Sequence, residues 1–132
     1  ASHRANGVDE FAISYLITLP EGTRMLYALD TGYYTDEAWE YLEGNKIGTL
    51  VMDSTFGGRT DRGEHPSGHL DVASFLKMLD RMSSIGFVDS STNIYATHIN
   101  PHQGLDHEGL QSAYDASGFT VTVAYDGLTI DV

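Results

Sequence analysis

Apolar side chains alternate with other residues over the first predicted strand. They stand at every second position between 10 and 19, as Phe11, Ile13, Tyr15, Ile17 and Leu19. A period of two is typical of a half-buried β-strand. A turn sequence at 20–23 is followed by an almost continuous apolar run over 25–29. We therefore predict a β-hairpin whose second strand is buried on both faces.

Three later segments have the pattern of helices. Thr35 is a typical N-cap with two acidic residues behind it, and Gly44 fits the end of that helix. Apolar residues recur at helical spacing over 70–83, which predicts a second helix. A short third helix is expected between Asp106 as its cap and Gly118 as its stop.

Four short apolar segments between and after these helices predict strands. The segment at 49–52 predicts a short buried strand, and the segment at 93–97 predicts the next strand, which ends at His98. The other two, at 120–125 and 128–132, are joined by Asp126-Gly127, a strong signal for a two-residue hairpin. Because strands alternate with helices along the chain, the fold class is α/β, and residues 1–132 form a single domain.

A long segment without periodicity spans 54–68 and contains four glycines and a proline. Structureless loops of this length are uncommon in compact domains, and those that occur are usually functional or disordered. The loop also holds Arg59 and Arg62, two of the seven basic residues of the chain.

The charge of the chain narrows the classes of partner. Lys and Arg number 7 against 19 Asp and Glu, so the formal net charge is −12. Such a chain repels polyanions, and we expect no independent nucleic-acid binding. There is no cysteine and no apolar run of about 20 residues, so we expect no thiolate site, no membrane span and a cytoplasmic location. A phosphate-bearing substrate would need positive charge from a metal or from placed arginines.

Two polar residues follow predicted strands and are candidate metal ligands. Asp30 ends the run over 25–29, and His98 ends the strand over 93–97. Ligands bind preferentially at the carboxyl ends of strands in open α/β sheets, and carboxylate with imidazole suits Zn, Mn or Fe. The alternative is local: an Asp before Thr-Gly often caps a turn, and a histidine at a strand end often only makes a hydrogen bond.

Several motifs resemble those of metallo-β-lactamase-fold hydrolases. Tyr27-Ala28-Leu29-Asp30-Thr31 is similar to that family's Y-x-x-D-T strand end, and Thr97-His98 to its late T-H strand end. Gly68-His69-Leu70-Asp71 resembles a G-H-L-S element of the phosphoribosyl cyclic-phosphate phosphodiesterase branch, and residues 124–130 resemble its terminal hairpin. The resemblance runs from about His3 to the C-terminus and implies an αββα sandwich with a mixed sheet and flanking helices.

The resemblance also implies roles for individual residues. Asp30 would bridge two divalent metal ions, Zn or Mn with Fe as a further choice, while His3 and His98 would each bind one of them. His69 would act as the general acid, and its place before a helix start would favour an anion. Asp53 is interpreted as a supporting or structural residue.

The remaining candidates concern substrate contact. His102 follows His98 closely, and Arg59 and Arg62 could contact a phosphate, although surface charge is the commoner role of such arginines. His65 and His107 are expected to be solvated or turn histidines.

One departure from the family pattern is informative. The leading metal motif of the family, H-x-H-x-D-H, does not occur in this sequence. We therefore expect residues 1–132 to be the C-terminal portion of a longer metallo-hydrolase that cleaves a small phosphate ester, such as a cyclic ribose phosphate. By itself the chain would be inactive, and an uncovered sheet surface would make it self-associate.

Three alternative functions stay open at the level of sequence. The first is a tRNA-processing endonuclease of the RNase Z type, which the net charge of −12 disfavours. The second is a metal-dependent lactonase or thioesterase, and the third is a non-catalytic assembly module that keeps the fold.

Overall fold

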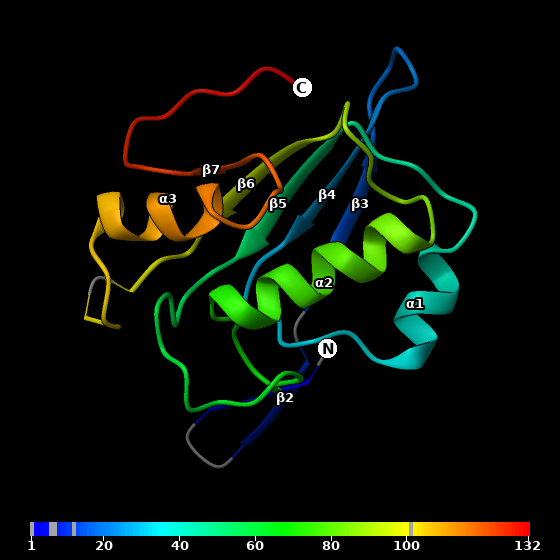
Figure 1. The fold of residues 1–132 in the computed structure, drawn as a ribbon. Coiled ribbons are helices and arrows are strands. Elements are labelled where there is room, and N and C mark those ends of the chain that lie inside the picture. The colour runs from blue at the N-terminus through cyan, green and yellow to red at the C-terminus, as the bar shows by residue number, and fades with distance from the viewer. Residues whose placement is uncertain (1, 6–7, 12, 101) are drawn as a thin grey trace.

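The computed structural model describes residues 2–5, 8–11, 13–100 and 102–132. These residues form an α/β fold with a five-stranded mixed sheet and, at the N-terminus, a separate two-stranded sheet (Figure 1). The elements in chain order are β1 (Ser2–Ala5), β2 (Val8–Phe11), β3 (Tyr15–Thr18), β4 (Arg24–Ala28), α1 (Asp36–Leu42), β5 (Thr49–Asp53), α2 (Val72–Ser84), β6 (Asn93–Thr97), α3 (His107–Asp115) and β7 (Val121–Val123).

The five-stranded sheet has the order β3-β4-β5-β6-β7. Strands β3 and β4 pair antiparallel, as the predicted hairpin requires, whereas β4 to β7 run parallel. Parallel neighbours need a crossover connection, which the three helices provide. All carboxyl ends of β4, β5 and β6 therefore meet at one edge of the sheet.

One hydrophobic core lies between the sheet and the helices. It contains inward residues of the strands together with side chains of all three helices, among them Trp39 of α1, Phe75 of α2 and Tyr114 of α3. The predicted caps are present, because the Thr35 side chain accepts from Ala38 N and the Asp106 side chain accepts from Gly109 N. The helix predictions are thus confirmed to within a few residues.

The predicted strand over 10–19 is wrong in extent, because the chain forms two separate strands there. Tyr15 pairs with Tyr27, so residues 11–14 would lie opposite 28–31 if the ladder continued. The partner chain turns away at this point, since Asp30 has a left-handed backbone with φ 50°. Ser14 instead accepts a hydrogen bond from the Tyr34 hydroxyl at 2.8 Å.

Burial of β4 on both faces is also contradicted. Leu26 and Ala28 are buried against the helices, but Tyr27 is 38% exposed on the opposite face. Among the described residues, no helix covers that face. Continuous apolar sequence therefore does not mark a doubly covered strand here.

The predicted C-terminal hairpin is not formed. Strand β7 ends at Val123, and residues 124–132 form no strand. Leu128 N donates to Tyr125 O across Asp126-Gly127, but only Gly127 of this pair has a positive φ, of 88°. A type I′ turn needs positive φ at both central residues, and a turn of this other type does not return the chain alongside its own strand.

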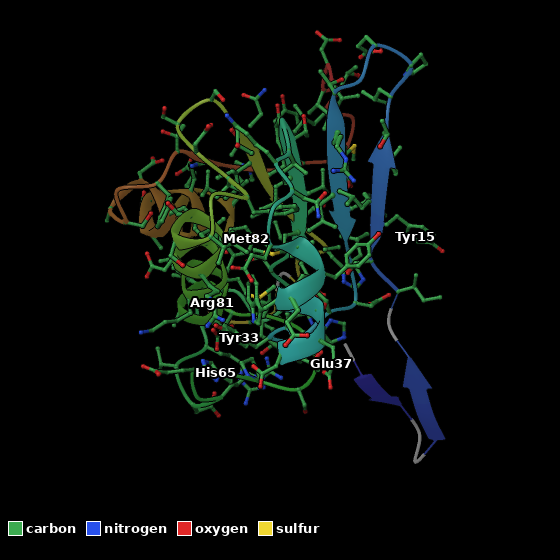
Figure 2. All side chains as sticks on the ribbon, turned by 90° about the vertical axis from the view of Figure 1, so that its right-hand side faces the viewer. Tyr15, Tyr33, Glu37, His65, Arg81 and Met82 are labelled. Atoms are coloured by element: carbon green, nitrogen blue, oxygen red, sulfur yellow. The ribbon has the colours of Figure 1, made fainter. Side chains whose placement is uncertain are left out.

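The uncovered face of the sheet carries an aligned row of side chains. The row crosses all five strands in register as Tyr15, Tyr27, Val51, Tyr95 and Thr122. Figure 2 shows Tyr15 pointing away from the helices. Self-association through this face stays a prediction, and light scattering over a concentration series checks it. In the described part of the chain, no helix is long and apolar enough to cross a membrane.

Candidate metal centre

The carboxyl ends of three parallel strands bring the candidate ligands together. Asp30 lies two residues beyond β4, Asp53 is the last residue of β5, and His98 directly follows β6. His69 joins them from the long loop before α2. These four residues form the strand-end cluster, in which one ligand atom from each lies within 4.8 Å of the others.

Both sequence-predicted strand-end ligands have an unusual backbone. Asp30 has φ 50° and His98 has φ 57°, and no other described residue except glycine has a positive φ. The left-handed region costs free energy for residues with a Cβ atom, so it persists only where surrounding contacts enforce it. Such residues concentrate at functional sites.

Asp53 is the buried centre of the cluster, with no exposed surface. Its Oδ1 accepts from Thr55 N at 2.8 Å and from Leu70 N at 3.4 Å. Its Oδ2 lies 2.8 Å from His69 Nδ1 and 3.3 Å from His98 Nδ1. Burial raises the pKa of Asp53, but the hydrogen bonds from His69 and Thr55 outweigh burial, so the pKa lies below its ordinary value.

His69 is held by the same carboxylate. The hydrogen bond to Asp53 raises the pKa of His69 above its ordinary value, although burial works in the opposite direction. Its ring also packs edge-on against Phe56, with ring centroids 5.6 Å apart. The loop therefore folds back over 14 residues to place this imidazole beside β5.

The helix start near His69 is not the anion site that the sequence suggested. The N-cap of α2 is Asp71, whose carboxylate accepts from Ser74 N, and the Ser74 hydroxyl accepts in turn from Asp71 N. This reciprocal capping box occupies the helix N-terminus with a negative charge of the chain itself. The carboxylate of Asp71 would repel an anion at this helix start.

The distances divide the cluster into two different pairs. Asp30 Oδ1 and His98 Nε2 lie 3.4 Å apart. Two ligand atoms at Zn–N and Zn–O distances of about 2.0–2.1 Å from one tetrahedral ion lie about 3.3 Å apart, so this pair fits one ion. Asp53 and His69 lie at hydrogen-bond distance, 2.8 Å, which is typical of groups that bind each other. Asp30 and His98 therefore fit a divalent metal, and Asp53 supports the two imidazoles.

The other predicted residues are not brought into this cluster. The side chain of His3 lies outside the described residues. His102 is exposed, and its backbone N donates to Asn100 Oδ1. Arg59 makes a two-point contact with Asp61, at 2.9 and 2.7 Å.

The Arg62 guanidinium makes its hydrogen bonds to backbone carbonyl groups of the protein. It donates to His69 O at 2.6 Å and to Gly68 O at 3.2 Å, and it lies 4.0 Å from the Phe56 ring centroid. It therefore fixes the backbone that carries His69. Contact of Arg59 or Arg62 with a phosphate stays a prediction.

The two histidines expected to be solvated each have a specific neighbour. His65 is exposed, but its ring stacks on the ring of Tyr33 with ring centroids 3.8 Å apart. His107 lies within hydrogen-bond distance of Val123 O, at 3.1 Å. Neither is among the four residues of the cluster.

An open cleft of about 580 Å³ lies beside His98. Its lining residues come from the loops after β5, β6 and β7: Thr55, Thr97, His98, Ile99, Asn100, Ala124, Tyr125 and Asp126. The cleft borders His98, so a molecule bound at the strand-end cluster would have room to extend there.

Sequence reasoning missed Thr55. Its hydroxyl lies 3.2 Å from His69 Nδ1, 3.0 Å from His98 Nδ1 and 2.7 Å from His98 O. The available signal was the Asp53-Ser54-Thr55 sequence after a buried strand, because an Asp two residues before a backbone N–H forms a local turn.

The comparisons with known proteins add no relationship. No family model matches the chain, and no curated protein matches it. The site is therefore interpreted from its own geometry and from the sequence motifs.

Proposed function

We propose that this chain carries part of the active site of a metal-dependent phosphodiester hydrolase. The observation that supports the proposal most is the separation of 3.4 Å between Asp30 Oδ1 and His98 Nε2 at the ends of two parallel strands. The two residues meet from opposite sides of β5, and both have left-handed backbones. A turn cap or a lone surface histidine would not require these two side chains to meet.

A divalent ion would be held here by Asp30 and His98. When bound, such an ion lowers the pKa of a coordinated water and stabilises negative charge on a phosphate. The second oxygen of Asp30 leaves this carboxylate able to bridge two ions, as the family resemblance implies, with His3 as the remaining ligand of this chain. Zn and Mn suit these donors, and Fe is a further choice.

His69 is proposed as the general acid, and the geometry selects which nitrogen acts. Its Nδ1 faces Asp53 Oδ2 at 2.8 Å, so the proton for a leaving oxygen would come from Nε2. Asp53 fixes the orientation of the ring and favours its protonated form. Arg62 holds the same residue from the backbone side through His69 O.

A small phosphate ester is the proposed substrate, with a cyclic ribose phosphate as the form that the resemblance implies. The net charge of −12 opposes a long polyanion such as RNA. The cleft beside His98 has a carboxylate, Asp126, in its wall, and no Lys or Arg is among its lining residues. A substrate part that enters this cleft would therefore carry no negative charge.

The proposed parent protein is longer than residues 1–132. It would supply the H-x-H-x-D-H motif, and a second layer of sheet against the face of Tyr15, Tyr27 and Tyr95 would complete an αββα sandwich. Two features support this proposal: the apolar row on that face, and the small set of ligands that the described residues offer.

Metal binding is tested by calorimetry of residues 1–132 with Zn²⁺ or Mn²⁺. We expect weak binding that Asp30→Asn and His98→Gln each abolish. His107→Gln is the matched control, because this histidine lies outside the cluster and bonds to Val123 O. Equal binding by all three variants would place the ion elsewhere and remove the basis of the proposal.

Activity is tested on bis(4-nitrophenyl) phosphate and on a cyclic ribose phosphate. Protein with its encoded upstream residues should cleave them until a chelator is added, whereas residues 1–132 should not. His69→Ala should lose about 10²-fold or more in turnover, as expected for a general acid. Cleavage of lactones or thioesters that is insensitive to His69→Ala would favour a lactonase, and metal binding without any cleavage would favour an assembly module.

A further inference from the structure

Thr55 is fixed between the two strands whose ends carry the cluster. Its backbone N donates to Asp53 Oδ1 at 2.8 Å, and its backbone O accepts from Asn100 N at 3.1 Å. The preceding Ser54 N donates to Thr97 O at 2.8 Å. The position of the Thr55 hydroxyl is therefore set by the loops after β5 and after β6 together.

The single proton of this hydroxyl is drawn to two acceptors, His98 O and the Asp53 carboxylate, whose pKa is lowered in part by a hydrogen bond from the Thr55 side chain. Thr55 Oγ1 lies 2.7 Å from His98 O, and a carbonyl oxygen only accepts. Once that proton is donated, the hydroxyl oxygen has only lone pairs to offer. Its contact of 3.0 Å with His98 Nδ1 is then a hydrogen bond only if Nδ1 carries a proton.

A second acceptor faces the same nitrogen. Asp53 Oδ2 lies 3.3 Å from His98 Nδ1, and an ionised carboxylate only accepts. Asp53 Oδ2 is closer to His69 Nδ1, at 2.8 Å, whereas Thr55 Oγ1 is closer to His98 than to His69. Asp53 Oδ2 is thus the main acceptor for His69 Nδ1, and Thr55 Oγ1 is the main acceptor for His98 Nδ1.

We propose that Thr55 is a positioning residue that holds His98 as the Nδ1–H tautomer and directs its unprotonated Nε2 at Asp30. The tautomer follows from the acceptors on the two sides of the ring, because Thr55 Oγ1 lies at hydrogen-bond distance from Nδ1, 3.0 Å, whereas Asp30 Oδ1 lies 3.4 Å from Nε2, beyond the usual range. This inference rests on the proposed function for its purpose, because a metal binds the nitrogen that carries no proton. Partners of this kind orient metal-binding histidines, and their loss typically costs 10–100-fold in affinity.

The same hydroxyl also forms a hydrogen bond with the backbone of His98. Its bond to His98 O holds the carbonyl of a residue with φ 57°. Loss of the hydroxyl would release both the ring nitrogen and the left-handed turn. Both effects would move Nε2 away from Asp30.

Thr55→Val tests the proposal, because valine keeps the branched shape but lacks the hydroxyl. Thr55→Ser restores the hydroxyl, and Thr122→Val on the exposed side of β7 is the matched control for the chemical change. Two measurements are made at pH 8 on residues 1–132. Long-range ¹H–¹⁵N correlation spectra of the metal-free chain identify the protonated ring nitrogen, and competition with a chromophoric chelator gives the Zn²⁺ affinity.

We expect His98 to be Nδ1–H in the wild-type chain, in Thr55→Ser and in Thr122→Val. Thr55→Val should show a mixture of tautomers and a 10–100-fold loss of Zn²⁺ affinity. Wild-type His98 in the Nε2–H form, or Thr55→Val with an unchanged tautomer, would overturn the proposal. If the wild-type chain binds no Zn²⁺, the proposed function fails, while the spectra still decide the role of Thr55.

Discussion

Charged residues are arranged differently at the two ends of the parallel strands: they form an exposed ion pair at the amino ends and a partly buried cluster at the carboxyl ends. At the amino ends of β5 and β6, Lys46 and Asp89 form an exposed ion pair at 2.6 Å. The hydrogen bonds from Lys46 and Ser91 hold the pKa of Asp89 far below its usual range. At the carboxyl ends, two carboxylates and two imidazoles gather within 4.8 Å, and one of the carboxylates is fully buried.

The difference lies in how charges are shared. The Lys46–Asp89 pair matches one cation with one anion in solvent, an arrangement that contributes little to stability. In the strand-end cluster, Asp53 is shared by two imidazoles, while Asp30 and His98 face each other at the distance of two ligands on one ion. The comparison teaches that burial and sharing, rather than the number of charged residues, distinguish the strand-end cluster from an exposed ion pair.

The largest effect is expected from Asp53→Ala. The substitution removes a buried acceptor from two imidazoles and from the backbone N–H groups of Thr55 and Leu70. Breaking a buried charged network in this way costs about 3 kcal/mol of unfolding free energy. Urea unfolding in the presence of a chelator measures it, with exposed Asp61→Ala as the control. A loss below about 1 kcal/mol would mean that Asp53 is not the centre of the network.

Asp30→Asn should change metal binding and leave the metal-free chain nearly as stable. Asparagine tolerates the left-handed backbone, but its amide is a poor ligand. Wild-type protein should gain about 2.7 kcal/mol at an ion concentration 100 times the Kd, and the variant should gain almost nothing. Thermal unfolding with and without Zn²⁺ measures both quantities. An equal gain in the variant would separate Asp30 from the metal.

A smaller effect is expected from pH in the metal-free chain. The pKa of Asp53 lies below its ordinary value of 3.8, so its stabilising contribution is present above pH 3.8 and is lost as the pH falls through the folded-state pKa. The pKa of His69 lies above 6.5, so its contribution is present below pH 6.5 and is lost as the pH rises through the folded-state pKa. Stability from this pair is therefore greatest between about pH 4 and 6.5.

Melting midpoints from pH 4 to 9 in chelator check this window, and His69→Gln is the variant to compare. The variant should lose the decline above pH 6.5 that the wild-type chain shows. A decline of the same size in both proteins would assign it to another group.

The smallest effect is expected at the amino ends of the strands. Lys46→Ala removes the partner of Asp89, but both side chains are largely solvated, at 62% and 41% exposure. The urea midpoint should not change measurably. A clear loss of stability would show that the two ends of the sheet differ less than the geometry indicates.

The sequence predicted the parts of the site that depend on local pattern. Strand periodicity placed Asp30 and His98 at strand ends, and the parallel order of β4 to β6 then brings such ends together. It did not predict how Asp53, Thr55 and His69 meet, because that depends on a loop of 14 residues without periodicity folding back on β5. Contacts over that separation leave no local signature.

Two errors in fold have different origins. The alternation over 10–19 continued through Ser14 although the partner strand had turned away at Asp30. Asp126-Gly127 indicated a hairpin, but the turn type that forms there needs only one positive φ, at Gly127. In the first case the position of the neighbouring strand decided the outcome, and in the second the type of turn decided it.

The most direct test is anomalous diffraction from crystals of residues 1–132 grown with Zn²⁺, recorded at the zinc absorption edge. The account predicts an anomalous peak bonded to a carboxylate oxygen of Asp30 and to His98 Nε2, with Asp53 still hydrogen-bonded to His69. Zinc bound at other residues while Asp30 and His98 remain in contact with each other would contradict it.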